Sequence, residues 1–288
     1  MIDGDIEVGG YLTGPGQPVF ARALNVGAAQ ARDQDQLNPV GNTTHFGRDY
    51  LTPPVWKLEF CIGEGIGPLE ALRALAQLQT AWRTAVNPEE PGAVTTLRYA
   101  AAGRTRRVYG RPRNFTPDVS RNLADGDVMA TAEFVTADPY HYDDLEGELT
   151  ITLRDNSNFG AVTLPAVWPL MSVPGAGRQG TIIVDGDAPT PVQVTFDGPV
   201  VNPALAAGEE WAVQTTTSLA YDRSLTIDAR TETVELEDGT PVPGVLSHET
   251  YLPGARLEPG IQELRFTGTD ATGTSKATIR WRNAYYSF

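Results

Sequence analysis

Two different periods of apolar residues identify the clearest elements of the chain. Over Val55–Ile62 every second residue is apolar, which is the period of a strand with one buried face. After Pro68 the period changes to three or four, which predicts an amphipathic helix from residue 68 to about 86. Its apolar stripe consists of Leu72, Leu75, Leu78, Trp82 and Val86. The helix is expected to end at Asn87-Pro88, because the residue before a proline avoids the helical region.

The rest of the first half predicts short strands and turns. Residues 1–54 are turn-rich, with strand candidates at Ile6–Val8 and Val19–Val26. A hairpin is predicted from Thr95–Ala100 and Arg104–Tyr109, and a further strand is expected at Val128–Thr136, after a turn at Asp125-Gly126-Asp127. The first half therefore predicts a β-rich domain with one helix.

The second half predicts strands alone. Eight segments have strand character and are separated by Gly- and Pro-rich turns, with no helical period between them. They are Leu149–Leu153, Thr181–Val184, Val192–Phe196, Trp211–Thr215, Ser224–Asp228, Thr233–Leu236, Glu263–Thr267 and Ala277–Trp281. This pattern favours a β-sandwich or jelly roll, with Trp281 on its buried face. The acidic run 143–148 is interpreted as an exposed hinge, so that residues 1–147 and 148–288 form two domains.

Composition narrows the function classes. The chain has 288 residues and a formal charge of −14, which argues against a partner that is itself a polyanion, such as nucleic acid or an anionic membrane. Met1–Glu7 is acidic and no apolar run reaches 18 residues, so we expect no signal peptide, no membrane span and synthesis in the cytoplasm. The single cysteine, Cys61, excludes an internal disulfide and is interpreted as an inert strand thiol.

No motif for catalysis is present. The three histidines have no metal-ligand spacing, and Gly63–Gly67 lacks the Lys-Ser/Thr of a phosphate-binding loop. Asp185-Gly186-Asp187 is interpreted as a hairpin turn rather than a calcium loop. The carboxylates at 143–148 could be those of a glycosidase, but an exposed linker is the favoured interpretation. We therefore expect no enzyme activity, cofactor or metal site. A sugar-binding platform built from the 5 Trp and 10 Tyr remains an alternative.

The arginines are unevenly distributed. The segment from Arg98 to Arg121 holds seven of them and one acid, Asp118, so it carries a charge of +6 within an acidic chain. Such a segment is either a solvated face or a contact surface for an acidic partner or a second copy of the chain. The candidate interface residues are Arg98, Arg104, Arg106, Arg107, Arg111 and Arg113.

The order of short motifs resembles a known family. Phe134–Tyr142 has the pattern F-x-x-A-D-P-x-x-Y. In the second half, a further series of short segments follows in a fixed order: Ser224–Asp228, Thr233–Leu236, Asp238-Gly239, Leu257–Gly260, Glu263–Phe266 and Ala277–Arg282. Together they resemble the distal tail protein, or siphovirus-type tail component, of long-tailed bacteriophages.

This resemblance implies a structural protein of the virion, placed at the tail tip. It implies an N-terminal domain that builds a ring, typically a hexamer, and a C-terminal galectin-like β-sandwich. The expected partners are further copies of the chain, the tail tube protein, the tail-associated hub protein and receptor-binding proteins. No catalytic or cofactor-binding residue is implied. The alternative is a carbohydrate-binding β-sandwich module of a phage tail or cell surface.

Overall fold

A computed structural model describes residues 1–62, 66–118, 128–153 and 178–288. The chain divides into two compact units, Met1–Asp144 with Tyr285–Phe288 and Leu145–Ala284. The sequence placed the boundary at residue 147 and assigned the whole remainder to the second domain. The last four residues instead belong to the first unit, because aromatic contacts described below hold them there. The predicted turn at 125–127 and residues 63–65 of the glycine-rich loop lie outside the described residues.

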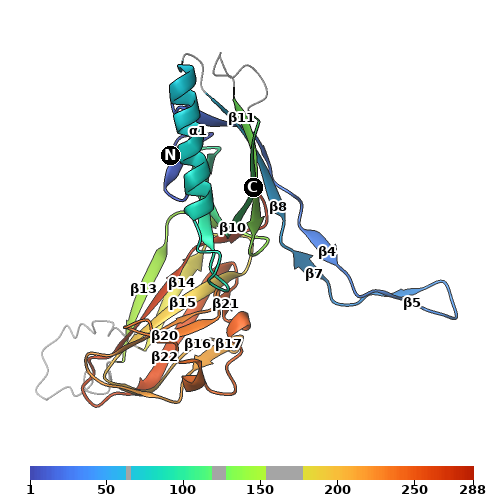
Figure 1. Cartoon of the computed structure of the whole chain (residues 1–288). Helices are drawn as coiled ribbons and strands as arrows, with labels where there is room; N and C mark the ends of the chain where they lie inside the picture. Colours follow the sequence, from blue (N-terminus) through green and yellow to red (C-terminus); the bar gives the residue numbers. More distant parts are fainter. Residues whose placement is uncertain (63–65, 119–127, 154–177) are drawn as a thin grey trace, which may run out of the picture. The chain divides into compact units, whose positions relative to one another are not determined.

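The first unit is built on one antiparallel sheet and a helix (Figure 1). Its main strand order is β2-β1-β9-β10-β11-β8-β3, and β12 pairs with β10. The strands are β1 (Ile6–Val8), β2 (Tyr11–Thr13), β3 (Val19–Asn25), β8 (Val55–Ile62), β9 (Thr95–Ala101), β10 (Arg104–Asp118), β11 (Met129–Thr136) and β12 (His141–Asp143). The predicted strand β8 is confirmed, with Trp56, Leu58 and Phe60 buried on one face.

The predicted helix is also confirmed, as α1 (Pro68–Thr84). It begins with Pro68, whose fixed backbone angle suits the first helical turn, and ends two residues before the expected position. Its apolar stripe packs on the sheet around Leu75, Leu78 and Trp82, which join the buried cluster of β8, β9 and β11. Leu72 is only partly buried, and Val86 lies beyond the helix.

A long hairpin of the first unit extends from its sheet between β3 and β8, and we call residues 27–53 the arm. Among the described residues its strands pair with each other alone: β4 (Gln30–Arg32) with β7 (Tyr50–Thr52), and β5 (Gln36–Leu37) with β6 (Thr44–His45). Figure 1 shows these strands in blue, drawn as a narrow ribbon without a covering layer. The sequence of this region predicts only turns and irregular chain.

The second unit has two antiparallel sheets. The first has the order β13-β23-β15-β19-β20, with β21 on β15, and the second the order β14-β22-β16-β17, with β18 on β16. The first sheet is made of β13 (Gly147–Thr152), β23 (Lys276–Trp281), β15 (Thr190–Asp197), β19 (Ser224–Asp228), β20 (Thr233–Leu236) and β21 (Arg256–Leu257). The second is made of β14 (Gln179–Val184), β22 (Gly260–Thr269), β16 (Val200–Ala207), β17 (Trp211–Gln214) and β18 (Ser218–Leu219). Two 3₁₀ turns, η2 (Pro243–Val245) and η3 (Leu252–Gly254), and a last short strand, β24 (Ala284–Tyr285), complete the chain.

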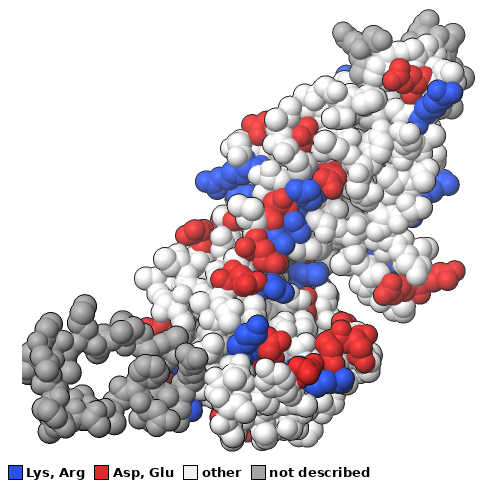
Figure 2. Space-filling view, turned by 90° about the vertical axis from the view of Figure 1, so that its left-hand side faces the viewer, with Lys and Arg blue, Asp and Glu red and all other residues white. Residues whose placement is uncertain are grey.

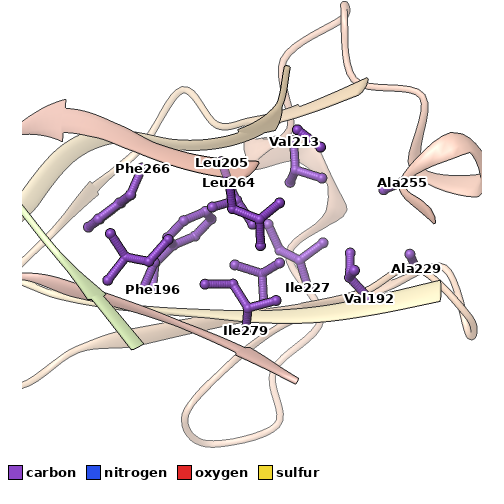
Figure 3. Close-up of a cluster of buried hydrophobic side chains, with 14 of the residues drawn as sticks. Val192, Phe196, Leu205, Val213, Ile227, Ala229, Ala255, Leu264, Phe266 and Ile279 are labelled. Carbon is purple, nitrogen blue, oxygen red and sulfur yellow. The ribbon is translucent and has the colours of Figure 1, made fainter. Parts of the chain in front are cut away.

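The two sheets enclose one apolar core, as the sandwich prediction requires. Figure 3 shows Phe196, Ile227 and Ile279 from the first sheet pointing toward Leu205, Leu264 and Phe266 from the second. The rings of Phe196 and Phe266 stack with centroids 5.6 Å apart. The mostly β fold expected for the chain is therefore confirmed. Among the described residues, no helix has the length and apolar character needed to cross a bilayer.

One expectation for the second unit is confirmed in part, and another is wrong. Trp281 packs against the core from the predicted face but is only partly buried, and its indole covers the backbone of Gly147 on the paired strand. A Cβ at Gly147 would lie 2.5 Å from the indole, so only glycine allows this close packing. Residues 185–187 are not a hairpin turn, because they connect β14 and β15, which belong to different sheets.

Candidate assembly surface

Two of the candidate arginines face each other on neighbouring strands and share one carboxylate. Arg98 on β9 and Arg107 on β10 are register partners, so their like charges would repel across the sheet. Asp144 lies between them and accepts hydrogen bonds from both guanidinium groups, with Arg98 Nη2 at 2.6 Å and Arg107 Nε at 3.0 Å. Glu7 on β1 accepts a further bond from Arg98 Nη1 at 2.8 Å. These arginines are therefore neutralised within the chain.

The charges around Asp144 determine its protonation. Burial raises the pKa of the Asp144 carboxyl, but the hydrogen bonds and charges of Arg98 and Arg107 outweigh burial and hold the pKa below its ordinary value of 3.8. Only 16% of the surface of the Asp144 side chain is exposed to solvent. Asp144 is thus ionised at neutral pH, and its charge is partly screened from water.

A third arginine holds the end of the chain in place. Arg106 is buried, its guanidinium lies 4.1 Å from the centroid of the Tyr285 ring, and its Nη1 donates to the carbonyl of Ser287 at 2.8 Å. Phe288 stacks on Tyr99 with centroids 4.9 Å apart and ring planes 9° apart. This packing could not be predicted from the sequence, because the four terminal residues have no periodic pattern.

Tyr99 is the buried residue on which this aromatic group packs. Its hydroxyl lies 2.7 Å from Nδ1 of His141, and burial raises the pKa of Tyr99 to about 12. Trp56 packs against the same tyrosine, edge to face, at 5.3 Å. The group therefore stabilises the first unit and has no nucleophile that is open to solvent.

The acidic run 143–148 contains the boundary between the two units, as expected, and Leu145, Glu146 and Glu148 are exposed, but its carboxylates are paired rather than free. Asp143 accepts a hydrogen bond from the hydroxyl of Tyr285, and Asp144 binds the two arginines described above. In the second unit, Glu146 pairs with Arg282 at 3.1 Å and Glu148 pairs with Arg280 at 2.9 Å. Each of these carboxylates thus has a basic or hydroxyl partner, and the run is a set of structural contacts.

Two of the remaining candidate arginines, Arg111 and Arg113, border a groove at the end of α1. The groove has a volume of about 400 Å³, and Trp82, Val86, Pro88, Pro112 and Phe115 form its apolar surface. Three arginines also line it, Arg83, Arg111 and Arg113, whereas its lining residues include no Asp or Glu. The β10–β11 ladder shifts register here, and Asn114 has a φ of 41°, so the backbone bends around the groove.

Three hydrogen bonds fix the walls of this groove. The indole Nε1 of Trp82 donates to the carbonyl of Arg113 at 3.0 Å. Arg111 donates to the carbonyls of Glu90 and Ala93, which attaches the loop after α1 to β10. The groove is therefore built by the fold, while the side chains of Arg83 and Arg113 stay exposed.

The structure does not bring the six candidate arginines together as one basic surface. Arg98 and Arg107 bind Asp144, Arg106 binds the C-terminal residues, Arg111 and Arg113 lie at the groove, and Arg104 is exposed at the hairpin end of β10. Figure 2 shows basic and acidic side chains interspersed on the face in view. Arg121 lies outside the described residues. Within the described part of the chain, no group of His, Cys, Asp and Glu is arranged to hold a metal.

Comparison with known proteins relates this fold to phage tails. No protein-family model and no curated protein sequence matches the chain. The Dit protein of phage SPP1, described as a paradigm of the hub adsorption apparatus in phages that infect Gram-positive bacteria, matches with a TM-score of 0.58 and 12% identity, over 97% of this chain and 98% of that chain.

Two structures of the phage P2 baseplate in its activated conformation also contain a similar chain. The structure with Ca matches with a TM-score of 0.54 and 11% identity over 94% of this chain and 93% of that chain. The structure with Sr matches with a TM-score of 0.54 and 12% identity over 96% of both chains. At these identities the similarity establishes a shared fold, and the predicted resemblance to distal tail proteins is confirmed at that level.

Proposed function

We propose that this protein is a structural component of a bacteriophage tail, located at its distal end. The observation that carries the proposal is the extent of the fold similarity, since 97% of the chain aligns with 98% of the SPP1 Dit protein. A match that spans both units is more informative than a shared sandwich alone, because single β-sandwiches serve many unrelated functions.

In this proposal the first unit builds a closed ring, most simply of six copies, and the second is a galectin-like domain. The ring links the tail tube to the tail-tip hub and the receptor-binding proteins, and the chain performs no catalytic step. A ring needs a head-to-tail contact in which each copy uses two different surfaces. The groove at the end of α1 and the exposed arm supply two such surfaces on the same unit.

Native mass spectrometry of the purified chain and labelling of assembled particles test this proposal. We expect a mass that is a multiple of the 31.0 kDa chain, and antibody label at the tail tip in electron micrographs. Label on the capsid, or absence of the chain from purified particles, would refute a role in the tail.

A second candidate function is supported by a polar pocket in the second unit. It has a volume of about 440 Å³ and lies where β15, β19 and β23 meet, between Asp197, Ser224 and Lys276. Tyr221 lines it with 67% of its surface exposed, which suits stacking on a sugar ring. If this pocket binds glycans, a glycan array detects a ligand that Tyr221→Ala loses and that Tyr251→Ala, at another exposed tyrosine, retains.

A further inference from the structure

The arm presents large apolar side chains to solvent. Every residue from 28 to 52 is exposed except Asn38, which is half-buried. The exposed fractions of Leu37, Val40 and Phe46 are 81%, 88% and 84%. An isolated two-stranded hairpin is marginally stable in water, and exposed apolar patches of this kind mark contact sites.

The arm is nevertheless organised for contact along one face. Leu37 and Thr44 are register partners, and Phe46 follows Thr44 by two positions. Because side chains alternate along an extended chain, Leu37 and Phe46 are placed on the same face. Nearer the base, the guanidinium groups of Arg32 and Arg48 lie 5.4 and 5.5 Å from the centroid of the Tyr50 ring. The hydrogen bonds that the structure describes for residues 28–52 join the arm only to itself.

The charges of the arm complement those of the groove. Asp33, Asp35 and Asp49 give the arm three carboxylates against two arginines, Arg32 and Arg48, so its net charge is −1, and both arginines lie over Tyr50 near the base. The groove offers apolar surface together with the exposed Arg83 and Arg113. One acid, Glu133, is bonded to a lining residue of the groove, since its carboxylate accepts a hydrogen bond from Asn114. The same carboxylate lies 3.8 Å from the ammonium of Lys57.

We propose that the arm of one copy docks in the groove of the next, with Leu37 and Phe46 against Trp82 and Val86 and the arm carboxylates beside Arg83 and Arg113. This inference rests on the proposed function and names the contact that closes the ring. The two surfaces are different, so the contact is head-to-tail, and each copy gives one arm and receives one. Deep apolar anchors surrounded by polar contacts are the usual source of affinity at such interfaces.

Cross-linking of two full-length variants tests the contact directly. The chain has one natural cysteine, so Phe46→Cys and Val86→Cys are each made in a Cys61→Ala background whose thermal transition is first shown to be unchanged. Under mild oxidation we expect a 46–86 disulfide dimer only in the mixture of these two variants. When Val86→Cys is instead mixed with Tyr251→Cys, we expect no 86–251 disulfide dimer. Dimers joined through residue 46 of both copies, or no 46–86 dimer at all, would overturn the proposal.

Self-association provides an independent measurement. Leu37→Ser with Phe46→Ser, and separately Arg83→Glu with Arg113→Glu, are expected to weaken assembly by about tenfold or more in sedimentation. The first pair removes the apolar anchors of the contact, and the second places like charges opposite the arm carboxylates. The matched controls Ile261→Ser and Arg265→Glu change exposed residues of the second unit and are expected to leave assembly unchanged. A mixture of the arm variant with the groove variant retains one intact contact per mixed pair, so it is expected to give dimers but no rings.

The outcomes separate this contact from the proposed function. Arm variants that form rings as the wild type does would overturn the arm–groove contact and leave the tail role intact. Absence of the chain from tails in the labelling experiment would refute the tail role itself. A wild-type chain that stays monomeric at every concentration and gives no mixed cross-link also overturns the contact.

Discussion

Removal of the Asp144 carboxylate should destabilise the first unit, because two arginines share it. Asp144→Ala leaves Arg98 and Arg107 opposite each other on β9 and β10, while Glu7 stays bonded to Arg98. The exposed fractions of the three side chains are 16% for Asp144, 18% for Arg107 and 33% for Arg98. The charges that lose their partner are therefore largely withdrawn from water.

The magnitude follows from this partial burial. Exposed ion pairs contribute about 0–1 kcal/mol, whereas breaking a buried pair costs about 3–5 kcal/mol. The intermediate exposure here gives an expected loss of about 2–3 kcal/mol. For a unit of this size each kcal/mol lowers Tm by about 2–4 °C, so we expect a decrease of about 4–12 °C in the transition of the first unit.

Calorimetry and hydrogen exchange measure this loss. The control is Lys57→Met in the same unit, which breaks a pair at 3.8 Å whose lysine is 66% exposed and which should cost less than about 1 kcal/mol. Peptides from β9 and β10 should lose protection in Asp144→Ala alone. A change in Tm no greater than that of Lys57→Met would show that the arginines find other partners and would refute the reasoning.

The pH dependence of the same contact has a definite sign. The pKa of Asp144 is lowered in the folded state, so its contribution is fully present above the unfolded value of about 4. That contribution is lost as pH falls through the lower folded value. The difference in stability between wild type and Asp144→Ala should thus be constant near neutral pH and should shrink only below about pH 4.

Three further changes test other parts of the structure. Phe288→Ala should cost about 1–2 kcal/mol in urea titrations followed by tryptophan fluorescence, because its ring stacks on buried Tyr99 although 54% of the residue is exposed. Trp281→Ala should cost about 1–3 kcal/mol in calorimetry, less than Leu264→Ala, because the indole is partly exposed and leaves a smaller cavity. Asp270→Ala should cost about 1–2 kcal/mol and speed amide exchange in its loop, because the carboxylate accepts three hydrogen bonds there; equal exchange rates would contradict this.

The sequence predicted the elements whose period is undisturbed. Val55–Ile62 and Ser224–Asp228 were placed at their observed bounds, because alternating burial leaves a direct trace in the sequence. β16 was missed, since Asn202-Pro203 within it has the character of a turn. In the structure Asn202 has a φ of 49°, and the register of β16 against β22 shifts at this point, which accommodates the proline as a bulge.

The contacts of the candidate surface could not be predicted in the same way. Asp144 lies 46 residues from Arg98 and 37 from Arg107, so their pairing depends on the strand order of the sheet and has no local signature. The C-terminal residues pack on the first unit through Phe288 for the same reason. A charged segment in the sequence thus indicates that partners exist but does not say whether they lie in the same chain.

This distinction decides how an arginine interface must be tested. Charge reversal at Arg106 or Arg107 would remove contacts to Ser287 and Asp144 inside the first unit, so loss of assembly would follow from unfolding as readily as from a broken interface. Arg104 and Arg113 are exposed, and their reversal leaves these internal contacts in place. Because only Arg113 lies at the groove, Arg113→Glu should weaken assembly while Arg104→Glu should not. Equal losses from both variants would instead indicate a general electrostatic attraction, which rising salt concentration would weaken.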